Sequence, residues 1–93
     1  MQDNSDKNKS YMNEFSKIMK IHRKTANKSM YLVSAESGIS KSSWREIEKG
    51  MREDINLSTF CKIAEGLDIP CHELLKELME KLGEDFSFTG LKN

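Results

Sequence analysis

The sequence predicts an all-α protein: a compact bundle of five helices, preceded by a flexible tail and followed by a short extension. Apolar residues recur three and four positions apart along most of the chain, which is the period of an α-helix. The only proline is Pro70, and long strand-like alternation is absent. With 93 residues, 32% of them charged, the chain suits one helix-rich domain with a small core.

The N-terminal part is expected to be a disordered tail followed by a helix. Residues 1–10 have almost no apolar content, so they bury too little surface to fold. A first helix is predicted from residue 11 to residue 24, with Ser10 as its N-cap. Its apolar positions share one side and consist of Tyr11, Phe15, Ile18, Met19 and His22.

Two short helices are predicted at the centre of the chain, over residues 30–37 and 41–49. Ser29 and Ser40 are suitable N-caps, and Gly38 tolerates the left-handed backbone of a sharp turn. Short helices need tertiary packing to persist. The residues spaced to converge behind this turn are Val33, Ile39, Trp44 and Ile47.

Two longer helices are predicted over residues 57–67 and 71–82. Asn56 can cap the first of them, and Pro70 suits the start of the second. Each has an apolar stripe, and that of the first is expected to face the core. The stripes consist of Leu57, Phe60, Ile63, Ala64 and Leu67, and of Leu74, Leu75, Leu78, Met79 and Leu82.

The expected organisation is a tail over residues 1–10, one domain over residues 11–83 and an extension over residues 84–93. The Phe-Ser-Phe alternation of the extension fits either a short strand or a segment docked on the last helix. No apolar run is long enough to span a membrane, and the N-terminus lacks a signal-peptide core. We therefore expect a cytoplasmic protein.

The composition argues against an enzyme, a metal centre and a disulfide. Cys61 and Cys71 are expected to be buried thiols, because a reducing cytoplasm disfavours a disulfide. The paired spacing of metal ligands is absent, as is a nucleophile with a neighbouring base. We expect no cofactor and no catalytic activity.

The formal net charge is zero, but the charge is unevenly distributed. Residues 1–29 carry seven Lys/Arg and three Asp/Glu, whereas residues 53–93 carry four and nine. A basic N-terminal half can bind phosphates while the acidic half faces away. Few counterions would be released, so non-specific binding to nucleic acid is expected to be weak.

The central helix pair carries the strongest functional signal. Packing of its apolar residues leaves a polar tip directed outward: Lys41, Ser42, Arg45, Glu46 and Lys49. Two short helices at a steep angle with such a tip form a helix-turn-helix arrangement. The N-terminus of the second helix adds free amide donors and partial positive charge, both suited to phosphate.

The stretch from Ser29 to Leu75 resembles the phage repressor and Cro (Xre-type) family of DNA-binding proteins. The similarity covers roughly residues 19–80 and implies a lambda repressor-like fold. The matching residues are Arg23, Gly38-Ile39-Ser40, Ser42, Ile47-Glu48-Lys49-Gly50, Arg52, Leu57, Thr59, Phe60, Lys62-Ile63-Ala64, Leu67 and Glu73-Leu74-Leu75.

This resemblance also implies roles for individual side chains. Arg23 would form a structural ion pair with Glu48 and hold the first helix against the third. The implied base contacts are Lys41, Ser42, Arg45 and Glu46. The implied phosphate contacts are Ser29, Ser40, Ser43, Lys49 and Arg52.

Several positions depart from the family pattern. Met30 stands where Gln is usual and cannot donate a hydrogen bond. Trp44 replaces a smaller Ile or Val, which implies a reshaped core or a partly exposed ring. Glu53 and Asp54 place two acids near the expected DNA surface.

Two functions of different classes follow. The first is a transcriptional regulator that binds an inverted repeat of double-stranded DNA as a homodimer, with helix 41–49 in the major groove. Its candidate dimer interface is the apolar excess after residue 70, made of Leu75, Leu78, Met79, Leu82, Phe86 and Phe88. The alternative is an antitoxin-like or adaptor module that keeps the fold, binds a protein partner through its C-terminal tail and has weak or no DNA binding.

Overall fold

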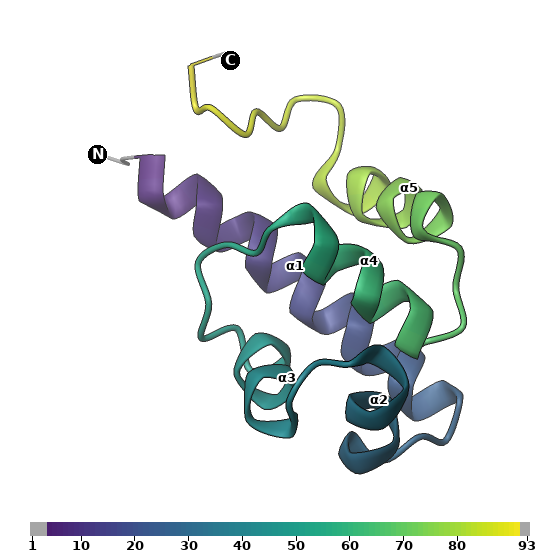
Figure 1. Ribbon diagram of the computed structural model, residues 1–93. Helices are drawn as coiled ribbons and strands as arrows, with labels where there is room; N and C mark the ends of the chain where they lie inside the picture. Colours follow the sequence, from purple (N-terminus) through teal and green to yellow (C-terminus); the bar gives the residue numbers. More distant parts are fainter. Residues whose placement is uncertain (1–3, 92–93) are drawn as a thin grey trace.

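Five helices and no strand are found in the part of the chain that the structure describes (Figure 1). The structure is a computed structural model that describes the backbone of residues 4–91 and the side chains of residues 11–91. The helices are α1 (Asn4–Thr25), α2 (Met30–Ser37), α3 (Lys41–Glu48), α4 (Leu57–Gly66) and α5 (Cys71–Leu82). The predicted all-α class is therefore confirmed.

Capping by short polar side chains sets where the central helices begin. The Ser29 hydroxyl accepts a hydrogen bond from the Leu32 amide at 3.1 Å, and the Ser40 hydroxyl accepts one from the Ser43 amide at 3.1 Å. Gly38 ends α2 with a φ of 77°, a backbone conformation that side chains with a Cβ disfavour. The bounds of α2 and α5 are the predicted ones, and α3 and α4 each end one residue early.

Helix α1 begins at Asn4, seven residues before the predicted start. The expectation of a disordered tail is therefore wrong for residues 4–10, and residues 1–3 lie outside the described part. The segment 4–10 contains no Gly or Pro. Extending a helix that packing has already nucleated costs far less than starting one, so weakly helical polar residues can continue it.

The core lies where α1 packs against α3 and α5 and where α2 packs against α3 and α4. Trp44 is completely buried at its centre, so its ring is not partly exposed as the sequence allowed. The Phe15 ring of α1 stacks on the Phe60 ring of α4, with centroids 5.1 Å apart. His22 is half-buried and its Nε2 lies 2.7 Å from Glu77 Oε1, which adds a polar link between α1 and α5.

Two leucines differ from their predicted positions. Leu78, predicted at a dimer interface, is buried in the core, so it has little exposed surface to contribute there. Leu57, expected in the core, is 75% exposed. It occupies the first turn of α4, before that helix reaches the centre of the bundle, whereas Leu78 lies in the middle of α5.

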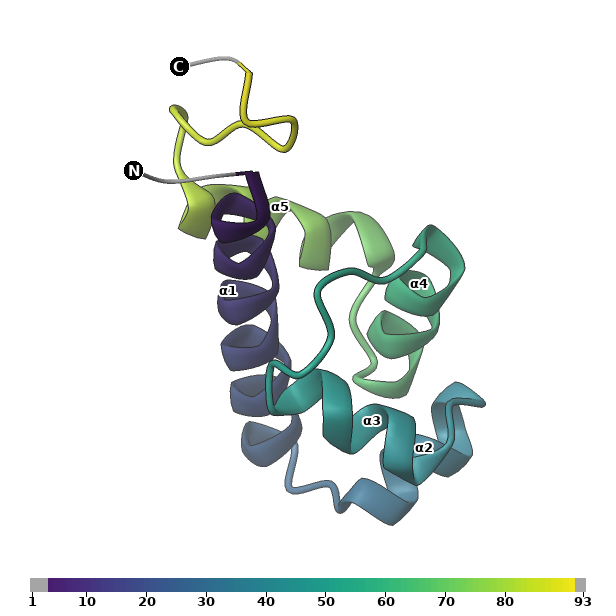
Figure 2. The same cartoon turned by 90° about the vertical axis from the view of Figure 1, so that its left-hand side faces the viewer.

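The segment after α5 forms no strand within residues 83–91. Instead the Phe88 ring packs edge-on against the Tyr11 ring of α1, with centroids 5.3 Å apart, and against Phe86 at 4.7 Å. Figure 2 shows this segment near the N-terminal end of α1, at the far end of the molecule from α2 and α3. The extension thus docks on α1 through Phe88.

None of the helices in residues 4–91 combines the length and the apolarity needed to cross a membrane. Cys61 and Cys71 are both free thiols, but they are half-buried rather than buried as predicted.

Candidate nucleic-acid interface

The turn between α2 and α3 is held by two serines of α2. The Ser34 hydroxyl donates to the Ile39 carbonyl at 2.6 Å, and the Ser37 hydroxyl accepts from the Ile39 amide at 3.1 Å. Both backbone groups of the buried Ile39 are therefore satisfied inside the turn. This arrangement fixes the direction in which α3 begins.

Helix α3 has a buried face and an exposed face. Trp44, Ile47 and Glu48 are buried, and they face α1 and α2. The side chains of Lys41, Ser42, Arg45 and Lys49 are exposed, whereas Ser43 and Glu46 are half-buried. A helix anchored on one side thus presents three cations and a hydroxyl to the surroundings.

The ion pair expected between Arg23 and Glu48 is present. Arg23 Nε and Nη2 donate to the two carboxylate oxygens of Glu48 at 2.8 and 2.7 Å. Trp44 Nε1 donates to the same carboxylate at 2.8 Å, and Arg23 Nη1 donates to the Lys28 carbonyl at 3.0 Å. This network joins the last turn of α1 to α3 and holds the buried carboxylate in place.

The network also sets the ionisation of its members. Burial by itself raises the pKa of Glu48, but hydrogen bonds from Arg23 and Trp44 outweigh it and hold that pKa below its ordinary value. The hydrogen bond to Glu48 raises the pKa of Arg23. Both groups are charged over the physiological pH range, so the ion pair joins α1 to α3 throughout that range.

A second ion pair lies on the outer surface, between the loop after α3 and α3 itself. Arg52 Nε donates to Glu46 Oε1 at 3.0 Å, and Arg52 Nη2 donates to the Ser43 hydroxyl at 3.2 Å. The sequence assigned Glu46 to a base and the other two residues to phosphates. The structure instead brings these three side chains together.

The other predicted phosphate contacts lie at helix starts. Ser29 begins α2 and Ser40 begins α3, and each hydroxyl accepts one amide hydrogen. The Ser40 hydroxyl also lies 3.5 Å from the Ser42 hydroxyl, and either of the two can be the donor. Lys49 is exposed immediately after α3. Glu53 and Asp54 are exposed in the following loop. Burial raises the pKa of the Tyr11 hydroxyl on α1, and the negative charge of Asp54 adds to this effect.

Lys28 is a supporting residue that the sequence did not single out. Its Nζ lies 2.6 Å from Glu36 of α2, 2.6 Å from Asp68 and 3.0 Å from the Gly66 carbonyl. The hydrogen bonds to Asp68 and Glu36 raise the pKa of Lys28. This residue therefore ties α2 to the turn that follows α4, and only the tertiary fold reveals its partners.

No family model matches the chain, and neither a curated protein nor a solved structure matches it. The similarity to the phage repressor and Cro family therefore stays a prediction, as do the DNA contacts it implies.

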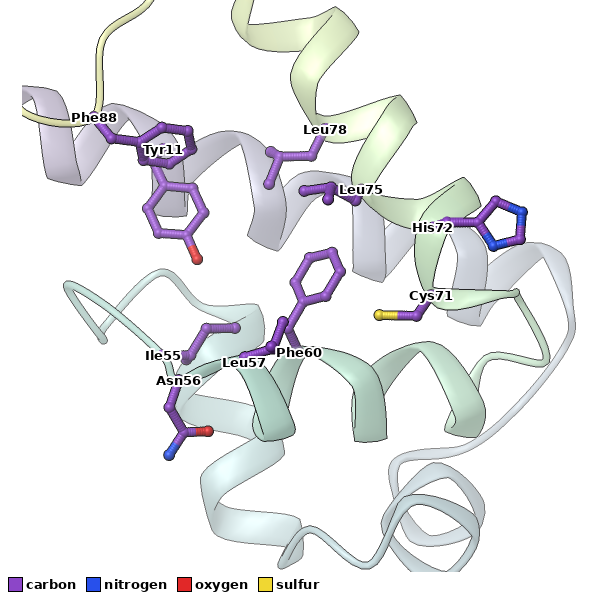
Figure 3. A pocket seen from close by; sticks show the side chains of 10 residues that line it. All are labelled: Tyr11, Ile55, Asn56, Leu57, Phe60, Cys71, His72, Leu75, Leu78 and Phe88. Carbon is purple, nitrogen blue, oxygen red and sulfur yellow. The ribbon is translucent and has the colours of Figure 1, made fainter.

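A different surface feature lies between α4 and α5, on the side of the bundle next to the C-terminal segment (Figure 3). It is an open apolar groove of about 490 Å³, and none of its lining side chains is an Asp, Glu, Lys or Arg. Its walls include Tyr11, Ile55, Leu57, Phe60, Leu75 and Phe88. Of the residues predicted at a dimer interface, Leu75, Leu78 and Phe88 line this groove, whereas Met79 and Phe86 line a separate hollow.

Among the side chains described, those of residues 11–91, no group of three or more His, Cys, Asp or Glu residues is arranged to hold a metal ion. Cys71 lines the groove at the start of α5. The neighbouring Cys61 thiol, together with burial, raises the pKa of Cys71 to about 11.

Proposed function

We propose that this chain is a sequence-specific DNA-binding transcriptional regulator of the lambda repressor-like helix-turn-helix type, acting in the cytoplasm of a bacterial host. The observation that carries the proposal is that α3 has one buried face and one exposed polar face. Trp44, Ile47 and Glu48 anchor the helix from within, and Lys41, Ser42 and Arg45 are exposed at its first two turns. A recognition helix needs this combination of a fixed axis and free polar side chains.

In this proposal the exposed side chains read bases in the major groove. Lys41 and Arg45 are suited to the O6 and N7 acceptors of guanine, and Ser42 can donate or accept. Lys49, Ser29 and Ser40 contact phosphates, and they are helped by the amide donors at the starts of α2 and α3. These contacts fix the register of the protein on the duplex.

A homodimer bound to an inverted repeat completes the proposal. One α3 per half-site contributes few contacts, and the neutral net charge supplies little non-specific affinity. The groove between α4 and α5 supports an interface, because Leu57, Leu75 and Phe88 expose apolar surface there. Leu57 is added to the predicted interface, and Leu78 lies at the floor of the groove with almost no exposed surface of its own.

The experiment that tests DNA recognition is selection from a pool of random duplexes with the purified chain. Wild type should enrich a short inverted repeat, and Lys41→Ala/Arg45→Ala should abolish the enrichment. The matched control is Lys17→Ala/Lys62→Ala, which removes the same charge from exposed positions of α1 and α4 and should enrich the wild-type sequence. Enrichment that is the same with the α3 variant as with wild type would reject the assignment of α3.

A protein-interaction module is the second candidate, and the apolar groove is the observation that favours it. Met30 at the start of α2 and the exposed Glu53 and Asp54 also weaken a DNA surface. Retention on a DNA or heparin column separates the candidates. Retention lost at moderate salt supports the regulator. Passage through the column at low salt, together with co-purification of a protein partner that Leu57→Asp abolishes, supports the module.

A further inference from the structure

The contact between Glu46 and Arg52 changes what each residue can do at the surface of α3. Glu46 lies in the middle of α3, and Arg52 follows in the loop after that helix. The Arg52 side chain folds back so that its Nε meets Glu46 at 3.0 Å and its Nη2 meets Ser43 at 3.2 Å. The Arg52 guanidinium therefore donates hydrogen bonds to side chains from two successive turns of α3.

This geometry leaves part of the guanidinium available. Among the side chains of residues 11–91, none accepts a hydrogen bond from Arg52 Nη1. Arg52 and Glu46 are 40% and 46% exposed, so the free edge of the guanidinium reaches solvent. An arginine whose Nε edge is held by a carboxylate keeps its remaining donors in a fixed plane.

We infer that Glu46 is a positioning residue that holds Arg52 for a phosphate contact, and that Glu46 does not read a base. This inference rests on the proposed DNA-binding function and deepens it, because it assigns the readout of sequence to Lys41, Ser42 and Arg45 alone. A Glu46 carboxylate that accepted a hydrogen bond from cytosine would give up Arg52 and leave a mobile cation beside the duplex.

The physical gain is preorganisation. A free arginine side chain loses rotamer freedom when it binds, whereas one already held by Glu46 and Ser43 has lost most of it in the unbound protein. The negative charge of Glu46 opposes this gain by repelling phosphates. The pair is useful only if positioning outweighs that repulsion, and a double-mutant cycle measures the two effects separately.

The test uses Glu46→Ala, Arg52→Ala and the double variant in the full chain, with Glu46→Gln as the conservative variant. Each is measured for the dissociation constant on the selected duplex and on an unrelated duplex, at several salt concentrations. Arg52→Ala should weaken binding to both duplexes by about tenfold, as expected for the loss of a charged hydrogen bond. The salt dependence should fall by about one ion.

Glu46→Ala should weaken binding to both duplexes when Arg52 is present. In the Arg52→Ala background the same change should leave affinity unchanged or raise it, because only the repulsion is then removed. Glu46→Gln keeps an acceptor for Arg52 Nε, so it should bind better than Glu46→Ala. A Glu65→Ala control removes one exposed carboxylate from α4 and should bind like wild type. Every variant should have the urea unfolding midpoint of wild type.

Two results would overturn the inference while the proposed function stands. One is strict additivity of Glu46→Ala and Arg52→Ala; the other is a changed base preference at a single position with Glu46→Ala. Failure of wild type to select or retain any duplex would instead reject the proposed function, and the inference with it.

Discussion

Arg23 at the end of α1 and Glu48 at the end of α3 are joined by two hydrogen bonds of 2.8 and 2.7 Å, and the side chain of Glu48 is only 3% exposed. This contact joins residues 25 positions apart in the chain. It fixes the helix that carries the exposed cations to the longest helix of the bundle, so it bears on stability and on the candidate interface together.

Removing one partner of this pair should be costly. Arg23→Met leaves the Glu48 carboxylate buried without its cation, and we expect the free energy of unfolding to fall by about 3 kcal/mol or more. Urea denaturation followed by circular dichroism measures the loss. Lys17→Met is the matched control, because Lys17 contacts Glu14 at 3.8 Å in an exposed pair and should change stability by less than about 1 kcal/mol. Equal effects of the two substitutions would contradict the prediction.

Stability should fall in acid partly through Glu48. Its pKa in the native state is below the ordinary value of 4.5, despite burial, because Arg23 and Trp44 hydrogen-bond the charged form. The native state therefore holds this proton less tightly than the unfolded chain does. The contribution of Glu48 is complete above pH 4.5 and is lost as the pH falls through its lower native pKa.

Urea midpoints of wild type and Glu48→Gln, measured from neutral to acidic pH, check this. Glu48→Gln should be less stable at neutral pH, and the difference from wild type should shrink as the solution becomes acidic. Two parallel profiles would show that Glu48 contributes nothing to the acid transition.

Gly66 allows α2 and α4 to approach closely. A Cβ at this position would lie 2.9 Å from Ser37 Cβ and 3.3 Å from the Val33 carbonyl oxygen. Gly66→Ala should therefore destabilise the protein by about 1 to 3 kcal/mol, although alanine is the better helix former. The exposed neighbour Glu65→Ala is the control for helix propensity. A higher melting temperature with Gly66→Ala would show that the two helices separate without cost.

The proposed dimer makes a prediction about the groove between α4 and α5. Leu57→Asp and Leu75→Asp should each raise the dissociation constant for self-association, because both leucines are exposed at the groove, 75% and 46% respectively. Ile21→Asp is the control, since Ile21 is 63% exposed on α1 and does not line the groove. Sedimentation velocity over a range of concentrations gives the answer. A wild-type chain that remains monomeric at high concentration would reject the dimer.

The thiol of Cys71 should alkylate slowly. Its pKa is raised to about 11, first by the neighbouring Cys61 thiol and then by burial, so little thiolate is present at neutral pH. Cys61→Ala removes the neighbouring thiol, and it should speed the reaction of Cys71 with iodoacetamide by about tenfold or more. Mass spectrometry of the labelled peptide measures the rate. An unchanged rate would mean that burial alone protects the thiol.

Capping and periodicity are local, and for that reason the sequence predicted most of the fold. Ser29, Ser40 and Asn56 accept the amide hydrogen bonds expected of N-caps. The local pattern failed at the N-terminal end, where the residues before Tyr11 have weak helical preference by themselves and are helical from Asn4 because they continue a packed helix.

In the candidate interface, too, some features were predictable from the sequence and others were not. The exposure of Lys41, Ser42 and Arg45 follows from helical periodicity around Trp44 and Ile47, and the sequence was sufficient for it. The partners of Arg52 and Glu46 were not predictable from sequence. Both residues are long and partly exposed, and their contact depends on the path of the loop after α3.

By itself the sequence determined the helical class, the helix starts and the polar face of α3, because these depend on residues within one or two turns of each other. Only the tertiary structure decided that Leu78 is inside, that Leu57 is outside and that Phe88 packs on Tyr11. Those outcomes depend on which parts of each helix are covered by neighbouring helices. This coverage is a property of the assembled bundle, and it cannot be read from a periodic apolar stripe in the sequence.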